Sequence, residues 1–372
     1  MNNFYLKHYF FLQFLLNFES SKKILPPKLH KFFIALFIGS FGGALFAYFS
    51  FPLAWMMGAM IAVTIAALSG LPVHVPIKIR SIFVSILGVM LGSAFTPALI
   101  TKAGDFGSVL LIQILYMIIA GSSVFLIYRF IAKYDPVTSY FSSTPGGLSE
   151  MTLVGEQFGG DPRIIPLNHS IRILIIVTLI PFYFRFIQGI DVPVAPPEKK
   201  QLWNLYDIII LSGCIFIGYP IAHKLRMPAA ALIGPMILSA TVHLAGITQA
   251  NVPSILVAVS QLIVGTSLGC RFTNRMSFKE MSKVIWIAVF AALIMITIAL
   301  LIVSLTNNFF SISSTTLFLS IAPGGLAEMS LIALALGTGT AFVTVMHFLR
   351  VTCVMLLGAA VFKLINKKTG FF

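Results

Sequence analysis

The sequence PGGLSEMTL at residues 145–153 returns as PGGLAEMSL at residues 323–331. Proline removes a backbone N–H donor and glycine tolerates unusual dihedral angles, so a continuous helix through either stretch is unfavourable. In the piece 312–337, about 11 residues precede the proline and about 12 follow the glycines, which as helix is roughly 15 to 18 Å on each side, or half a bilayer. We therefore predict that this piece and its counterpart, residues 138–160, are each a broken or re-entrant helix.

The composition indicates a membrane protein around these two pieces. The chain has 372 residues, of which 58% are hydrophobic and only 10% are charged, with a net charge of +14. So few charges exclude a disordered chain, a disulfide-rich secreted module and most soluble enzymes. Uncharged runs such as 32–73 and 284–327 are long enough for one or more spans of about 20 residues. The predicted fold class is an all-α polytopic membrane protein.

Cutting the apolar runs at proline, glycine and charge clusters predicts ten crossings in two sets of five. They are residues 33–49, 53–70, 80–98, 106–130 and 164–186, then 205–223, 228–246, 253–271, 283–305 and 340–363. The predicted organisation is a lipid-facing, basic N-terminal extension (1–32), a first membrane repeat (33–190), a linker (191–204), a second membrane repeat (205–366) and a C-terminal tail (367–372).

An internal duplication follows from blocks that recur 176 to 178 residues apart. Besides the Pro-Gly-Gly blocks, the pairs are PLAWMMG at 52–58 with PAAALIG at 228–234, GVMLGSAFT at 88–96 with GTSLGCRFT at 265–273, and His-x-x-Arg at 169–172 and at 347–350. The glycines Gly88 and Gly92, and likewise Gly265 and Gly269, lie four apart, a spacing that permits close helix contact.

The charges favour an inverted arrangement of the two repeats. With a cytoplasmic N-terminus and five crossings per half, 19 of the 25 Lys and Arg residues lie on the cytoplasmic side and 4 lie outside, in keeping with the positive-inside rule. Arg172 and Arg350 lie within spans and complete the 25. Six full crossings per half would instead make the repeats parallel and move several basic loops to the other side. We therefore expect inverted repeats with both termini in the cytoplasm.

The ionisable residues inside the predicted membrane region mark a candidate site, because each is costly there unless paired or hydrated. His and Arg three residues apart share one helix face. Each glutamate falls in the first turn of a half-helix, whose N-terminus carries about half a positive charge. The predicted substrate and ion site comprises Thr144, Pro145, Gly146, Gly147, Ser149, Glu150, His169 and Arg172 in the first half and Pro323, Gly324, Gly325, Glu328, Ser330, His347 and Arg350 in the second.

Two interpretations of these residues remain open. In the functional one, they surround a polar cavity made of two half-sites. In the structural one, each Glu satisfies a helix start and forms a buried ion pair with Arg that holds the repeats together. Buried pairs are a costly way to gain stability, which favours the functional interpretation.

Enzymatic activity is not expected from the sequence. A serine hydrolase based on Ser149 and His169 would lack its counterpart in the second repeat, where Ala327 stands. The sequence has no H-E-x-x-H, and its three cysteines, Cys214, Cys270 and Cys353, lie far apart, so no metal site or cofactor is predicted. The basic excess is explained by topology, so no nucleic-acid partner is expected.

The PGGLSEM and PGGLAEM blocks, each with H-x-x-R beginning 19 residues after its Glu, resemble the bacterial membrane family known for an internal AbrB duplication, over about residues 33–366. The resemblance implies a location in the bacterial cytoplasmic membrane. Members carry labels such as AbrB-family transcriptional regulator and ammonia monooxygenase. Neither label follows from these residues, because the DNA-binding AbrB fold is a small soluble β domain and an oxygenase needs a cluster of metal ligands. The duplicated, broken-helix design of the family is more similar to secondary transporters.

The expected function is therefore ion-coupled secondary transport of a small anionic or zwitterionic solute through a site at the bilayer midplane. Arg172 and Arg350, with the half-helix N-termini, would hold the solute. The two glutamates and the two histidines would bind the coupling proton or sodium ion, since histidine titrates near neutrality. The alternative is a membrane sensor that binds a ligand, affects gene expression indirectly and transports nothing.

Overall fold

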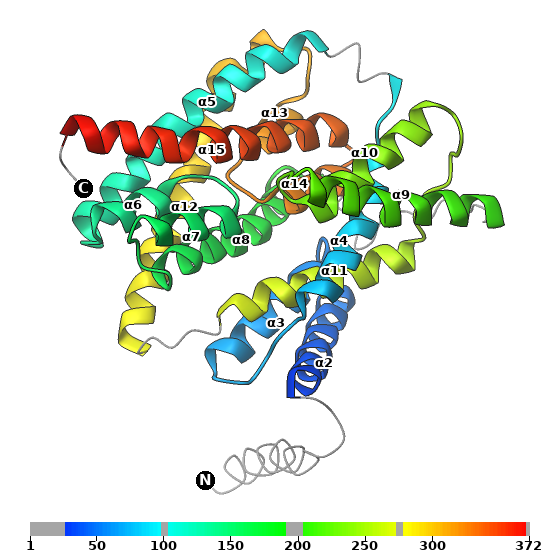
Figure 1. Cartoon of the computed structure of the whole chain (residues 1–372), viewed down its shortest axis with the longest axis horizontal. Coiled ribbons are helices and arrows are strands. Elements are labelled where there is room, and N and C mark those ends of the chain that lie inside the picture. The colour runs from blue at the N-terminus through cyan, green and yellow to red at the C-terminus, as the bar shows by residue number, and fades with distance from the viewer. Residues whose placement is uncertain (1–26, 98–102, 191–203, 273–277, 370–372) are drawn as a thin grey trace, which may run out of the picture.

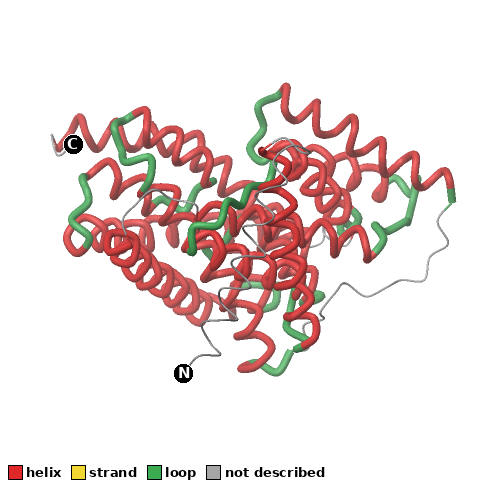
Figure 2. Tube along the Cα trace, turned by 90° about the horizontal axis from the view of Figure 1, so that it is seen from below, coloured by secondary structure: helices red, strands yellow, loops and turns green. Residues whose placement is uncertain are grey.

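The computed structural model describes residues 27–97, 103–190, 204–272 and 278–369, and within these ranges all regular structure is helical (Figures 1 and 2). Seven helices are long and apolar enough to cross a membrane. They are Lys28–Tyr48, Gly104–Ile131, Ile164–Ile187, Leu205–Lys224, Ser254–Phe272, Glu280–Phe309 and Thr340–Leu364. The all-α fold class is thereby confirmed. Most of the predicted N-terminal extension and nearly all of the predicted linker lie outside the described residues.

The helices follow the same order in the two halves of the chain. The first half has α2 (Pro27–Tyr48), α3 (Ala54–Leu68), α4 (Ile77–Gly92), α5 (Ala103–Leu126) with a π-helical end (Ile127–Ile131), α6 (Pro136–Ser143), α7 (Leu148–Gln157) and α8 (Ile164–Phe182) with a second π-helical end (Tyr183–Ile187). The second half has α9 (Leu205–Lys224), α10 (Ala230–Leu244), α11 (Ser254–Gly269) with a 3-10 end (Cys270–Phe272), α12 (Phe278–Thr306) with a 3-10 end (Asn307–Phe309), α13 (Ser314–Ile321), α14 (Leu326–Ala335) and α15 (Thr340–Thr369). Each predicted crossing coincides with a helix.

Three of the ten predicted crossings are shorter than expected. Helices α3 and α10 have 15 residues and α4 has 16, which at 1.5 Å per residue is about 22 to 24 Å and less than a full hydrocarbon core. The start of α3 is delayed by Leu53, whose φ of 48° is left-handed, and the start of α10 by Ala229 with φ of 47°. The prediction of ten crossings of membrane length is therefore too high, since seven helices among the described residues have that length.

The two halves of the chain are interlocked, because helices of one pack against helices of the other. Helix α4 packs on α10, and α11 packs on α3. The hydroxyl of Ser85 donates to the Ala231 carbonyl and that of Ser239 to the Val89 carbonyl, both at 2.7 Å. The helices approach so closely at the glycine pairs that a Cβ at any of these four glycines would overlap a backbone carbonyl of the facing helix. The predicted role of the glycines in close helix contact is confirmed.

Replacing Gly265 with alanine should destabilise the protein by about 1 to 3 kcal/mol, the usual cost of overpacking. The added methyl group would overlap the Met56 carbonyl and push α11 away from α3. The matched control is Gly213→Ala on α9, where a Cβ has no neighbour within 4 Å. Thermal unfolding in detergent should show a lower Tm for Gly265→Ala than for Gly213→Ala. Equal Tm values would contradict this account, because the α11–α3 contact would then tolerate a side chain at position 265.

Candidate functional site

Neither Pro-Gly-Gly sequence lies within a helix. Helix α6 ends at Ser143 and α7 begins at Leu148, and α13 ends at Ile321 and α14 begins at Leu326. The first helix of each pair has 8 residues and the second has 10, slightly fewer than expected from the sequence. Each interruption frees backbone carbonyls at the end of one helix and N–H groups at the start of the next.

The two histidines tie the following long helix to the first short helix of each pair. His169 of α8 contacts the Phe141 carbonyl through Nε2 at 2.9 Å, and His347 of α15 contacts the Leu319 carbonyl in the same way at 2.8 Å. A carbonyl oxygen only accepts, so Nε2 carries the hydrogen in both rings. The Nδ1 atoms are buried and have no hydrogen-bond partner in the described part of the chain. Each ring therefore retains one free acceptor.

The two arginine side chains donate hydrogen bonds to the freed backbone carbonyls, and not to the carboxylates of the glutamates. Arg350 donates from Nη1 to the Ala322 carbonyl at 2.7 Å and from Nη2 to the Gly324 carbonyl. Arg172 makes the matching contacts to the carbonyls of Thr144 and Gly146, both at 3.5 Å. A positive charge beyond the C-terminal end of a helix also suits the helix dipole.

The proposed buried Glu–Arg ion pairs of the structural interpretation are therefore wrong. No ion pair joins Glu150 to Arg172 or Glu328 to Arg350, although the structure describes all four residues. Arg172 and Arg350 interact electrostatically with each other and with Tyr116. The two interruptions thus lie near one another in the interior.

The glutamates occupy the predicted place in the first turn of α7 and of α14. Each carboxylate folds back over the second glycine of its Pro-Gly-Gly, because a Cβ at Gly147 or Gly325 would overlap Oε2 of Glu150 or Glu328. This close approach explains why glycine is needed there. Glu328 is only 6% exposed. Within the described chain neither carboxylate has a hydrogen-bond or ion-pair partner.

Arg271, at the 3-10 end of α11, exerts an electrostatic effect on the site, although the sequence reasoning placed it among the cytoplasmic loop charges. It is partly buried and interacts electrostatically with Glu328, Glu150 and Arg80. The Arg271 guanidinium therefore lies within electrostatic range of carboxylates from both halves of the chain. The signal in the sequence was its position in the matched GTSLGCRFT block, where the first half has Ala94.

The predicted hydroxyl groups bind within their own helices. Thr144 donates to the Tyr140 carbonyl at 2.8 Å and Ser330 donates to the Leu326 carbonyl at 2.7 Å. Ser330 also accepts a hydrogen bond from Thr344 at 2.8 Å. Pro323 is buried, and the side chain of Ser149 lies outside the described part of the structure. Neither Thr144 nor Ser330 therefore offers its proton to a ligand.

An apolar groove of about 480 Å³ runs between α5, α6 and α15 and reaches the first interruption at Thr144 and Pro145. It is lined in part by the small residues Gly121 and Gly358 and by Cys353. The positions 178 residues away, Ala299 and Ile180, are buried where α12 packs on α8. Matching helix pairs of the two halves are thus packed unequally.

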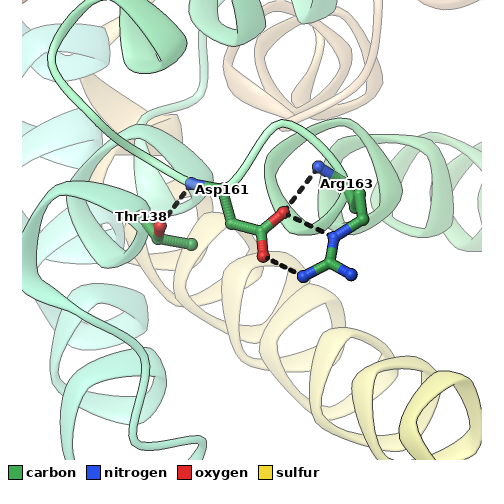
Figure 3. A network of polar contacts seen from close by, with 3 residues as sticks. All are labelled: Thr138, Asp161 and Arg163. Carbon is green, nitrogen blue, oxygen red and sulfur yellow. Dashed lines mark hydrogen bonds and ion pairs between the residues drawn. The ribbon is translucent and has the colours of Figure 1, made fainter.

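The loop that follows α7 is tied to the start of α6 (Figure 3). The carboxylate of Asp161 accepts hydrogen bonds from the backbone N–H and the guanidinium of Arg163, and the Asp161 N–H donates to the Thr138 hydroxyl at 2.8 Å. The hydrogen bond from the Arg163 side chain holds the pKa of Asp161 below its ordinary value. In the second half, the hydroxyls of Thr316 and Thr338 make a 2.6 Å bond at the matching place. Each loop therefore anchors the first short helix of its pair.

Comparison with known proteins identifies relatives that cover most of the chain. The family model described as "Transition state regulatory protein AbrB" matches residues 55–366. The uncharacterized protein YhjN of Bacillus subtilis (strain 168) is 26% identical over 367 residues, covering 90% of this chain and 92% of the relative. A protein of Escherichia coli (strain K12) named as a candidate regulator, AbrB, is 24% identical over 328 residues, covering 85% and 90%.

Proposed function

We propose that this chain, which belongs to the AbrB family, is an ion-coupled secondary transporter of a small anionic or zwitterionic solute. One observation carries the proposal. Glu150 and Glu328 come from opposite halves of the chain, Glu328 is only 6% exposed, and neither carboxylate has a hydrogen-bond or ion-pair partner within the described chain. Charges enclosed in a membrane protein are costly and mark ion or substrate pathways. A bound solute and a coupling ion would supply the missing partners.

The proposed architecture is a pair of inverted repeats in which the interrupted helices enter the membrane from opposite faces. The shared helix order supports it, and so does the exchange of partners, since α4 packs on α10 as α11 packs on α3. Inverted repeats with discontinuous helices at the midplane are the common plan of secondary transporters. Both termini would lie in the cytoplasm of a bacterium, because the basic residues gather on that side.

Alternating access would come from movement of the helices around the interruptions. Helices α5 and α15 correspond to α12 and α8 of the other half. A groove lies between α5 and α15, whereas α12 packs tightly on α8. A second state in which the two packings are exchanged would open the other side. Arg172 and Arg350 would keep the interruptions in shape, while Glu150, Glu328 and the free Nδ1 atoms of the two histidines would take up the proton or sodium ion.

Counterflow tests this proposal. Purified protein in proteoliposomes loaded with unlabelled amino acids or monocarboxylates should accumulate the matching labelled solute, and an inward proton or sodium gradient should increase that uptake. Empty liposomes treated in the same way provide the background rate. Saturable binding of a solute in detergent without any counterflow would contradict transport.

That contrary outcome would instead support the second candidate, a membrane sensor that regulates gene expression. The name of the Escherichia coli relative, a candidate regulator, favours this reading. A sensor needs the binding site but no second open state.

A further inference from the structure

The groove between α5, α6 and α15 lies on a surface that faces the hydrocarbon region of a membrane. Its residues on α5 and α15 belong to two of the membrane-length helices, Gly104–Ile131 and Thr340–Leu364. Its lining includes exposed aliphatic side chains, such as Ile118, which is 60% exposed, and Leu357, which is 57% exposed. Contiguous exposed apolar surface marks contact with lipid or with another protein. The groove therefore has an apolar occupant.

The hydroxyl groups of the groove are largely engaged within the protein. Tyr140 of α6 donates to the Gly358 carbonyl of α15 at 2.9 Å. Ser143 and Thr144 both donate to the Tyr140 carbonyl, at 3.0 and 2.8 Å. The hydroxyl of Ser122 lies at the exposed rim. A hydrocarbon chain in the groove therefore leaves these three buried donors paired, whereas a polar solute finds no free donor among them.

The groove is long and narrow and lies within one half of the membrane. On α5 it extends from Ile114 to Phe125, which at 1.5 Å per residue is about 16 Å, or about half of a hydrocarbon core. Helices α5 and α15 run in the same direction, because the rings of Phe106 and Phe342, near the two helix starts, stack with centroids 4.4 Å apart. The groove lies between the later residues of both helices. It therefore occupies the leaflet in which both helices end.

Basic residues follow the groove at that end on both helices. Arg129 is four residues after Phe125 on α5, and Lys368 is seven residues after Val361 on α15, so by helix register each continues the helix face that lines the groove. The end of α15 carries three lysines, which are Lys363, Lys367 and Lys368. This apolar groove therefore leads to a positively charged end.

The acidic residues at this end do not neutralise these lysines. The Asp135 carboxylate caps α6 by accepting the Thr138 N–H at 2.8 Å, and the Asp161 carboxylate pairs with Arg163. Glu156 is exposed on α7 and has no ion-pair partner in the described chain. Three lysines beside one unpaired carboxylate leave an excess of positive charge.

We infer that this groove binds one acyl chain of an anionic phospholipid, whose phosphate lies at the basic ends of α5 and α15. Anionic lipids are abundant in the cytoplasmic leaflet, and basic pockets between transmembrane helices on that side bind their headgroups. The bias of basic residues towards the cytoplasm assigns this end to the same leaflet. In the matching interface of the other half, α12 packs directly on α8, and no such chain is accommodated. The lipid site goes beyond the proposed transport and does not depend on it.

Filling the groove tests the acyl-chain site. Gly121 lines the groove, and a Cβ there would meet no atom within 4 Å, so Gly121→Leu fills the space without a backbone clash. Gly107→Leu is the matched control, because Gly107 is on the same helix, is equally free of neighbours and does not line the groove. Thermal unfolding of the purified full chain in detergent, titrated with phosphatidylglycerol, gives an apparent Kd. Gly121→Leu should weaken it by at least about tenfold relative to Gly107→Leu.

A lipid with the same chains and a zwitterionic headgroup, phosphatidylcholine, tests the assignment of the phosphate. The wild type should bind phosphatidylglycerol more tightly, by about fivefold for each basic residue that contributes. Replacing Lys367 and Lys368 together with glutamine should reduce this preference. The matched control replaces Lys224 and Arg226 together with glutamine, because both are exposed at the end of α9, away from the groove. Its preference should equal that of the wild type.

Equal apparent Kd values for Gly121→Leu and Gly107→Leu would overturn the acyl-chain site, and equal affinity of the wild type for the two lipids would overturn the anionic headgroup. Gly358→Leu, on the α15 side of the groove, should give the same loss and keeps the test valid if Gly121→Leu does not fold. A second copy of the chain is the competing occupant. If Gly121→Leu changed the oligomeric mass measured by light scattering while lipid binding stayed at the wild-type level, the groove would be an interface between copies and the lipid site would be refuted.

Discussion

Replacing Arg350 with alanine should lower the free energy of unfolding by roughly 2 to 5 kcal/mol, because two charge-assisted hydrogen bonds are lost in the interior. The side chain is 2% exposed and donates to the carbonyls of Ala322 and Gly324. Water does not reach these carbonyls easily once the guanidinium is removed, so they remain unpaired. The measurement is thermal unfolding of the ligand-free protein in detergent. A large fall in Tm is expected.

Arg172→Ala is an internal comparison from the first half of the chain. Its guanidinium makes the same two contacts, but at 3.5 Å, near the limit for a hydrogen bond. The expected fall in Tm is therefore less than half of that for Arg350→Ala. Arg350→Lys should recover part of the loss, because lysine retains the charge but not the two-pronged geometry. A larger effect at Arg172 than at Arg350 would contradict this account.

The position of every helix could be predicted from the sequence, because apolar runs and the proline, glycine and charge clusters between them coincide with the helices and their ends. The lengths of α3 and α10 could not be predicted from the sequence. Their late starts depend on left-handed backbone at Leu53 and Ala229, and neither residue type signals that conformation as glycine would. The interruptions at Pro-Gly-Gly were predictable, since those residues oppose a helix by their own chemistry.

The sequence indicated which histidines and arginines lie close to the interruptions, but not what they bind. The His-x-x-Arg spacing correctly placed each histidine and arginine on the face toward an interruption. Their partners are backbone carbonyls, which carry no residue-specific signal, so the structural alternative, in which Arg pairs with Glu, was wrong. Arg271 was missed because nothing in the linear sequence brings it near Glu150 or Glu328, and a basic residue at a helix end is usually a loop charge.

Glu328→Gln should reduce gradient-driven uptake into proteoliposomes by at least about tenfold, equivalent to about 1.4 kcal/mol. The amide keeps the shape of the side chain but removes the negative charge and the proton-binding oxygen that a coupling ion needs. Glu328 is buried and Glu150 only partly so, and the field of a charge is less screened in the interior. We therefore expect Glu150→Gln to slow uptake as well, but less than Glu328→Gln.

Glu156→Gln is the matched control for this pair, because Glu156 lies on α7 with Glu150 but is exposed. Its uptake rate should equal that of the wild type. Measuring solute exchange without an ion gradient separates two roles for Glu328. If exchange persists while gradient-driven uptake is lost, the carboxylate binds the coupling ion, and if both are lost it also holds the solute. A rate for Glu328→Gln equal to that of Glu156→Gln under the gradient would remove Glu328 from the transport mechanism, because an uncharged side chain at that position would then suffice.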